Sequence, residues 1–246
     1  MLLLFDLGNS RAKWTTWSAG QYAQFGTADP GHPDWEMKLQ LQLHGIAAPD
    51  RTLLASVAGE QVLAVVQRLT RSLWKQEPVQ LQSQASQCGV RNAYAEPARM
   101  GVDRWLAMLA AWNRFQRAVC IFDIGTAVTA DIVAADGRHL GGLIAPGIAL
   151  SQSVLQSQTA GVRHANSVAR DVLGQDTGTC VANGCLLSVV GTLRMALELM
   201  ERECGVGGAL VATGGDAPGI LPFLPASCVH VPTLVFDGMV LAAGDQ

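Results

Sequence analysis

The chain has 246 residues, of which 49% are hydrophobic and 15% charged, so it can fill a core, and the composition excludes a largely disordered chain. The net charge of −3, with 14 Arg and 3 Lys, gives no support for a broad basic face that binds nucleic acid. The length fits one large domain or two of about half that size.

The apolar start of the chain reaches Asp6 too soon to be a signal peptide, and we identify no apolar run long enough to span a bilayer. We therefore expect a cytoplasmic protein that binds neither membranes nor nucleic acid. No Cys-x-x-Cys pair is present, and no cysteine has a histidine at metal-ligand spacing, so we interpret the cysteines as free thiols rather than a zinc site. They are Cys88, Cys120, Cys180, Cys185, Cys204 and Cys228.

The first half of the chain alternates apolar runs with turn residues and helical patterns. We predict strands at residues 2–5 and 12–17, a helix at 35–44, a strand at 52–57, a helix at 60–74 and a short strand at 78–81. Residues 82–97 carry scattered polar side chains and are predicted to be loop. The Ala- and Leu-rich run that follows Gly101 predicts a buried or amphipathic helix.

The second half opens with a strand ending at Asp123, a returning strand, a turn at Asp136-Gly137 and a third strand at 139–145. Helices are predicted at 148–158 and 180–203, a strand at 209–213, and a short strand with a closing helix from 236. Gly184 and Gly191 let the long helix approach a neighbour closely, either the core of its own chain or a second chain.

Two similar segments each join a buried strand to a glycine turn. A shift of 117 positions places Asp6 on Asp123, and it also aligns Phe5 with Phe122. In such a hairpin the aspartate can hold a cation while backbone N–H groups and hydroxyls contact an anion. The repeat predicts two related halves that face a phosphate site.

Two further positions carry competing interpretations. Asp103 precedes a helical run, so position alone favours a helix N-cap, although a helix start also holds a carboxylate rigidly enough for catalysis. Gly214-Gly215 directly follows a strand, which permits a nucleotide contact or simply a tight turn. The chain has no G-x-x-x-x-G-K-[ST] and no G-x-S-x-G, which excludes a P-loop NTPase and argues against a serine hydrolase.

A series of motifs in chain order resembles the type III pantothenate kinases, a family that also includes the Bvg accessory factor proteins. The motifs are DLGNSRAKW, NAY, GVDRW, FDIGTAVTAD, GGLIAPG, GQDTGTCVANG and TGGD. The resemblance implies an α/β fold of two ribonuclease-H-like (actin-like ATPase) domains, residues 1–117 and 118–246, with mixed sheets flanked by helices. It also implies ATP-dependent phosphorylation of pantothenate, the first step of coenzyme A biosynthesis.

The resemblance assigns roles to matching positions. Asp103 is expected to be the general base, Asp123 to bind a monovalent cation (K⁺ or NH₄⁺), and Asp6 to lie near Mg²⁺. The expected ATP-binding residues are Asp6, Leu7, Gly8, Asn9, Ser10, Arg11, Ala12, Lys13 and Thr126. The expected pantothenate-binding residues are Tyr94, Gly101, Val102, Asp103, Arg104 and Thr177.

Thr177 is expected to act from the other subunit of a homodimer whose sites lie at the subunit interface. Three positions depart from the family pattern: Ser10 replaces a usual Thr but keeps the hydroxyl, and Cys180 and Asn183 replace usual Ala and Ser. Arg104 is expected to pair with the pantothenate carboxylate, and the alternative is a surface salt bridge. Two other functions stay open: a kinase of this superfamily for another small hydroxyl substrate, and a non-catalytic regulator.

Overall fold

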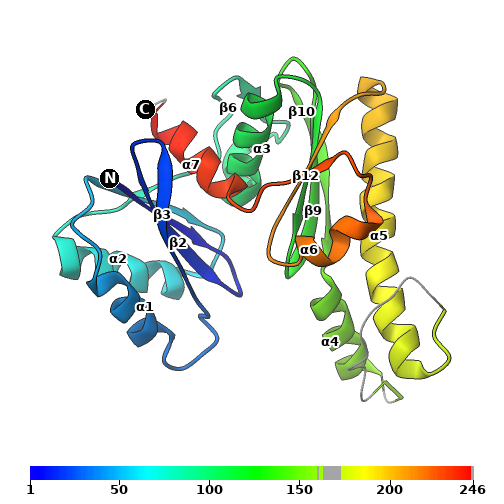
Figure 1. The fold of residues 1–246 in the computed structure, drawn as a ribbon, viewed down its shortest axis with the longest axis horizontal. Helices are drawn as coiled ribbons and strands as arrows, with labels where there is room; N and C mark the ends of the chain where they lie inside the picture. The colour runs from blue at the N-terminus through cyan, green and yellow to red at the C-terminus, as the bar shows by residue number, and fades with distance from the viewer. Residues whose placement is uncertain (160, 163–172, 245–246) are drawn as a thin grey trace. The chain divides into compact units, whose positions relative to one another are not determined.

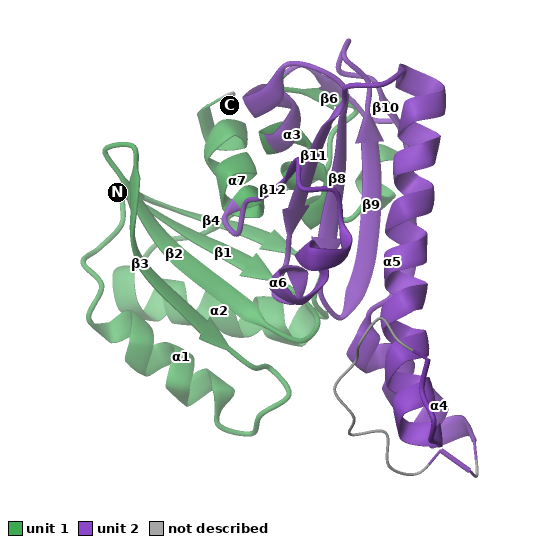
Figure 2. Ribbon diagram, turned by 45° about the vertical axis from the view of Figure 1, so that its right-hand side comes forward, with its two compact units in different colours: residues 1–88, 94–110, 234–246 green, residues 89–93, 111–233 purple. Residues whose placement is uncertain are grey.

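The computed structural model describes residues 1–159, 161–162 and 173–244 (Figure 1). The chain forms two compact units (Figure 2). Unit 1 contains residues 1–88, 94–110 and 234–246, and unit 2 contains residues 89–93 and 111–233. The boundary between residues 117 and 118 refers to the duplicated halves rather than to these units, and it stays a prediction.

Unit 1 is built on a five-stranded sheet of order β3-β2-β1-β4-β5. β1 runs antiparallel to β2, which runs antiparallel to β3, whereas β4 and β5 are parallel to β1. The strands are β1 (Leu2–Leu7), β2 (Ala12–Ser18), β3 (Gln21–Ala28), β4 (Arg51–Ser56) and β5 (Val79–Gln80).

Both faces of this sheet are covered, which explains why the middle of β1 and of β4 is apolar and buried, whereas Asp6 and Ser56 lie near the strand ends. Alternate residues such as Leu3 and Phe5 pack with α1 (Trp35–His44) and α2 (Glu60–Trp74). Strand β1 also contacts α7 (Leu234–Gly244). A Cβ on Gly238 of α7 would lie 2.1 Å from the carbonyl oxygen of Leu106, so glycine lets α7 pack tightly against α3 (Val102–Phe115).

Unit 2 repeats the same plan, with a five-stranded sheet of order β10-β9-β8-β11-β12. Again the first three strands in sequence are antiparallel neighbours, and the last two run parallel to the central one. The strands are β8 (Val119–Ile124), β9 (Ala127–Val133), β10 (His139–Pro146), β11 (Ala209–Thr213) and β12 (Cys228–His230). The predicted α/β fold with mixed sheets and helical layers is confirmed.

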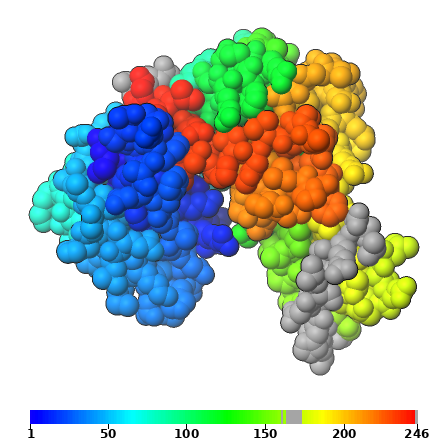
Figure 3. Space-filling model, viewed as in Figure 1, coloured from blue at the N-terminus to red at the C-terminus, as the bar shows by residue number. Residues whose placement is uncertain are grey.

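Helix α5 (Thr177–Cys204) crosses the sheet of unit 2, where Leu186, Val190 and Leu193 pack with Phe122 of β8 in one hydrophobic cluster. The helices α4 (Ile148–Gln158) and α6 (Ala217–Ile220) complete this unit. The first turns of α5 and all of α4 extend beyond the sheet as a projection (Figures 1 and 3).

Several predicted elements match closely, and others differ. Strand β3, at the edge of its sheet, was not predicted. Residues 82–97 contain the paired strands β6 (Ser86–Gln87) and β7 (Val90–Arg91), and a 3₁₀ turn, Pro97–Arg99, follows. Helices α5 and α7 begin three and two residues earlier than predicted, because α5 has its own N-terminal cap at Asp176.

Helix α5 corrects one expectation and decides between two alternatives. It spans 28 residues and is long and apolar enough to cross a membrane by length and composition, contrary to the expectation that no run is. Less than half of that apolar stretch is buried within the described structure. Gly184 and Gly191 do not pack in the core of their own chain, because both are exposed and no described atom lies within 4 Å of a Cβ at either position.

Candidate active site

The first predicted phosphate loop is the tight turn between β1 and β2. The N–H of Gly8 donates to the carbonyl of Arg11 at 3.0 Å, which closes the turn and exposes Asn9 and Ser10. Leu7 and Ala12 flank the turn and are fully buried, and the Leu7 carbonyl accepts the N–H groups of Val57 and Ala58.

Asp6 sits one residue before the end of β1, directly opposite Lys13 in the β1–β2 ladder. The Lys13 Nζ lies 3.7 Å from the Asp6 Oδ2, and the Asp6 side chain is 13% exposed. The pKa of Asp6 is raised to about 6, chiefly by burial and also by the negative charge of Asp103, and Lys13 opposes both effects. Asp6 and Asp103 therefore lie close enough for their charges to interact, which leaves excess negative charge that a cation would neutralise.

Asp103 lies in the first turn of α3, but it is not the N-cap predicted from its position. The helix begins at Val102, and the N–H of Trp105 bonds the carbonyl of Gly101 at 3.1 Å, which makes Gly101 the cap. The Asp103 Oδ1 instead accepts the N–H of Arg104 at 2.8 Å. A Cβ on Gly101 would lie 2.6 Å from that oxygen, so glycine leaves room for the carboxylate. Val102 is buried.

Arg104 and Tyr94 form a second polar contact beside Asp103. The Arg104 Nη1 donates to the Tyr94 hydroxyl at 3.1 Å, and its guanidinium lies 5.9 Å from the centre of the Tyr94 ring. Arg104 is only 6% exposed, which rules out the alternative of a surface salt bridge. Two residues that the sequence assigned to pantothenate thus contact each other.

Asp123 occupies the position in unit 2 that Asp6 occupies in unit 1. It is the second-last residue of its strand and is half-buried, and it pairs with Thr129 across the hairpin and with Thr213 of β11. Gly214 adopts a φ of +95°, and a Cβ there would lie 2.5 Å from the Asp123 Oδ1. The glycine after β11 therefore keeps space beside this carboxylate.

Thr126 lies at the exposed tip of the β8–β9 turn. Its carbonyl accepts the N–H of Gly147 at 2.9 Å, and a Cβ on Gly147 would lie 2.0 Å from the Gly125 oxygen. The Pro-Gly before α4 thus packs directly on the second hairpin turn, which explains why that dipeptide needs glycine.

Thr177 is the first residue of α5 and is exposed on the wall of a groove of about 970 Å³ between α4 and α5. Asp176 was not predicted as a site residue; its carboxylate caps the helix by accepting the N–H and hydroxyl of Thr179 at 2.9 and 2.6 Å. The signal was available, because aspartate is a preferred N-cap residue directly before a helix.

Ser56 is a second position that the sequence did not single out. It ends β4 beside Leu7, and its hydroxyl is buried with no hydrogen-bond partner among the described residues. No group of three or more His, Cys, Asp or Glu side chains that could bind a metal occurs among those residues. All six cysteines are free, which confirms the interpretation of them as thiols.

The repeated sheets, each with an aspartate beside a hairpin turn, form a duplicated α/β fold of the actin-like ATPase type. The fold matches a Baf-family transcriptional activator from Campylobacter jejuni with a TM-score of 0.61 at 19% identity, covering 97% of this chain and 95% of that one. It also matches the activator of 2-hydroxyisocaproyl-CoA dehydratase from Clostridium difficile with bound ADPNP, with a TM-score of 0.53 at 15% identity, covering 98% and 92%. At these identities the likeness shows the fold alone.

Sequence comparison identifies the family. The sequence model described as type III pantothenate kinase matches residues 2–198. The type III pantothenate kinase of Nitrosococcus oceani is 35% identical over 251 residues, covering 100% of this chain and 94% of that protein. The enzyme of Pseudomonas aeruginosa is 37% identical over 253 residues, covering 98% of each. The chain belongs to the type III pantothenate kinase family.

Proposed function

We propose that this protein transfers the γ-phosphoryl group of ATP to the 4′-hydroxyl of pantothenate. The observation that supports this most directly is the grouping in unit 1 of Asp6, Asp103 and the Arg104–Tyr94 pair. It combines a buried carboxylate suited to a nucleotide-bound cation, a second carboxylate in a helix start, and donors suited to a carboxylate-bearing substrate. Family membership supplies the substrate.

The reaction needs positioning more than covalent chemistry. The substrate hydroxyl oxygen forms a bond to the γ-phosphorus, the bond from that phosphorus to the β–γ bridging oxygen breaks, and ADP leaves with the electron pair. We assign the hydroxyl proton to Asp103, and the transfer comes late because the transition state is loose. Arg104 is assigned to the pantothenate carboxylate, since guanidinium offers a planar pair of donors.

The Asp6 carboxylate fits a site for the Mg²⁺ that accompanies ATP, because it is buried near a second carboxylate and its charge is only partly balanced by Lys13. That ion neutralises charge on the phosphates. We assign the turn between β1 and β2, with Asn9 and Ser10 exposed, to the ATP phosphates. Asp123 is assigned to a monovalent cation, which a single carboxylate with neighbouring hydroxyl and carbonyl oxygens suits.

We further propose a cytoplasmic homodimer in which Thr177 reaches the pantothenate site of the partner. Thr177, Gly184 and the apolar Val154 and Leu155 line the groove between α4 and α5, and all four are exposed in the single chain. A second copy of the chain packed on this face would bury them. The open space at Gly184 and Gly191 suits a close approach of two helices.

The test is ADP release coupled to a reporter enzyme, with and without pantothenate and potassium. We expect release that depends on both. Release with another small alcohol but not with pantothenate would support a different superfamily kinase, and no release with any acceptor would support a regulator.

A further inference from the structure

A buried histidine and aspartate in unit 2 have no role in the mechanism above. The His139 Nε2 lies 3.1 Å from the Asp131 Oδ1, and the two side chains are 0% and 3% exposed. They face each other across the β9–β10 hairpin. Burying such a pair costs free energy unless both side chains are fully hydrogen-bonded. We therefore look for its role in the hydrogen bonds that the two side chains make.

The second nitrogen of the imidazole accepts a hydrogen bond from outside the hairpin. The N–H of Ala93 lies 3.4 Å from the His139 Nδ1, which makes Nδ1 the acceptor and assigns the ring hydrogen to Nε2, where it is donated to Asp131. Asp131 thus fixes the tautomer that leaves Nδ1 free to accept. Ala93 is bonded directly to Tyr94.

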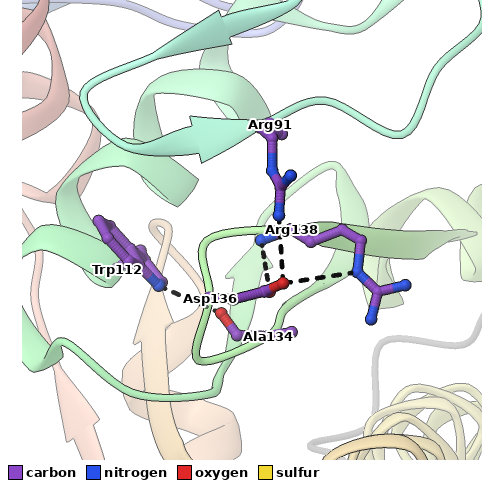
Figure 4. A network of polar contacts seen from close by, with 5 residues as sticks. All are labelled: Arg91, Trp112, Ala134, Asp136 and Arg138. Carbon is purple, nitrogen blue, oxygen red and sulfur yellow. Dashed lines mark hydrogen bonds and ion pairs between the residues drawn. The ribbon is translucent and has the colours of Figure 1, made fainter.

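The same hairpin holds the preceding residues through its turn (Figure 4). The Arg91 N–H donates to the carbonyl of Gly137 at 2.8 Å, and the Arg91 guanidinium lies 3.1 Å from the Asp136 Oδ2. The indole N–H of Trp112 donates to the carbonyl of Ala134 at 3.1 Å, which holds the start of the turn.

Glycine is required where the two segments meet. A Cβ on Gly137 would lie 2.0 Å from the carbonyl oxygen of Gly89, so the backbones of the turn and of the segment before Arg91 approach closely. Gly89, Arg91 and Ala93 therefore each contact the hairpin, and His139 holds the last of them.

We propose that His139, oriented by Asp131, is a positioning residue for Tyr94. The hydroxyl of Tyr94 is held by Arg104, and its backbone is held one residue away through Ala93. Because the hydroxyl and the neighbouring backbone are both held, the position of the Tyr94 ring and hydroxyl relative to the substrate is fixed. The inference deepens the proposed function, because it rests on Tyr94 contacting pantothenate.

Two substitutions at one position separate positioning from packing. In His139→Asn the side-chain oxygen reaches the Nδ1 position and can still accept from Ala93, but the smaller side chain leaves a cavity. In His139→Gln the terminal amide reaches the Nε2 position and can still donate to Asp131, but the acceptor for Ala93 is lost. We expect His139→Asn to lose more thermal stability and His139→Gln to lose more pantothenate affinity.

The kinetic measurement compares the change in KM for pantothenate with the changes in KM for ATP and in kcat. His139→Gln should raise the pantothenate KM about 3–10-fold, the range expected for one lost hydrogen bond, with the ATP KM unchanged. His139→Asn should leave it within about twofold. Adding His139→Gln to Tyr94→Ala should cause no further rise, because the histidine acts through the tyrosine. The proposal would be overturned if the pantothenate KM rose in proportion to the loss of thermal stability across the two His139 variants. It would also be overturned if the effects of His139→Gln and Tyr94→Ala on that KM were additive.

A second readout does not depend on catalysis. The chain has two tyrosines, so 3-fluorotyrosine labelling gives two ¹⁹F NMR signals, assigned with Tyr94→Phe. His139→Gln should shift or broaden the Tyr94 signal and leave that of Tyr22, and His139→Asn should leave both. An unchanged Tyr94 signal in His139→Gln overturns the positioning role even if the protein phosphorylates another substrate. A wild type without pantothenate-dependent ADP release, but with the expected signals, overturns only the proposed function.

Discussion

Replacing Asp6 with asparagine should stabilise the protein while removing its nucleotide site. The pKa of Asp6 is raised from 3.8 to about 6, chiefly by burial. A raised carboxyl pKa means that folding favours the neutral form, so this contribution is fully present below about pH 3.8 and is lost as the pH rises through about 6. Each pKa unit corresponds to about 1.4 kcal/mol, so ionised Asp6 costs about 3 kcal/mol at pH 8.

Asp6→Asn keeps the shape and removes the charge. We expect its free energy of unfolding to exceed that of the wild type by up to about 3 kcal/mol at pH 8, and by less than about 1 kcal/mol at pH 4. At 2–4 °C for each kcal/mol in a chain of this size, the shift in Tm at pH 8 is about 6–12 °C. Urea unfolding at both pH values without nucleotide measures the difference.

Asp34→Asn serves as the matched control, because Asp34 is an exposed aspartate of the same unit, at the start of α1. It should show no gain that grows with pH. The same experiment with Mg-ATP should stabilise the wild type and leave Asp6→Asn unchanged. A variant that is no more stable than the wild type at pH 8, or whose gain is as large at pH 4, would refute the argument that Asp6 holds an uncompensated charge.

Three further predictions address the remaining roles. Asp103→Asn should keep the fold and pantothenate binding but lower turnover by about 10²–10⁴-fold in steady-state assays, and near-normal turnover would contradict its role as base. Activity should depend on potassium or ammonium and fall in sodium, and Asp123→Ala should abolish that dependence; an intact potassium response in the variant would exclude Asp123 as the ligand. Mixing an Asp103→Asn chain with a Thr177→Arg chain should restore about a quarter of wild-type activity after subunit exchange, since half the dimers carry one intact site. No recovery would place Thr177 outside the partner's site.

The sequence predicted most of the fold because the central strands are buried on both faces. Such strands appear as short, continuous apolar runs, and the hairpin turns between them carry glycine. The aspartate next to each turn revealed the duplication, which the two identical strand orders confirm. The helices at 35–44, 60–74 and 148–158 agree with the prediction, since each begins directly after an Asp or a Gly.

Strand β3 could not be predicted in the same way. It is an edge strand with most of its side chains exposed, so it lacks the apolar pattern of a buried strand. Its register depends instead on packing: a Cβ on Gly26 would lie 2.3 Å from the Trp14 ring of β2. That constraint becomes visible only when the two strands are paired.

The polar contacts of the site were even less accessible. The sequence motifs identified Asp6, Asp103, Arg104 and Tyr94 as site residues. They did not show how one of these residues changes the pKa or the contacts of another. The raised pKa of Asp6 depends on burial and on a residue from a different element, and the burial of Arg104 depends on how α3 packs. Long-range electrostatics follows from the fold and cannot be deduced from spacing along the chain.

Asp6 and Asp103, the two aspartates of the proposed site, show why such a site is less stable than it could be. Asp6 is buried on the first strand, where folding disfavours its ionised form. A cation bound there, as proposed above, would recover that free energy when the nucleotide binds. Asp103 instead lies half-buried in a helix start, where its carboxylate accepts the backbone N–H of Arg104. These surroundings fit the two proposed roles, a cation ligand for Asp6 and a proton acceptor for Asp103. Because both residues are aspartates, the difference between their proposed roles comes from their surroundings alone.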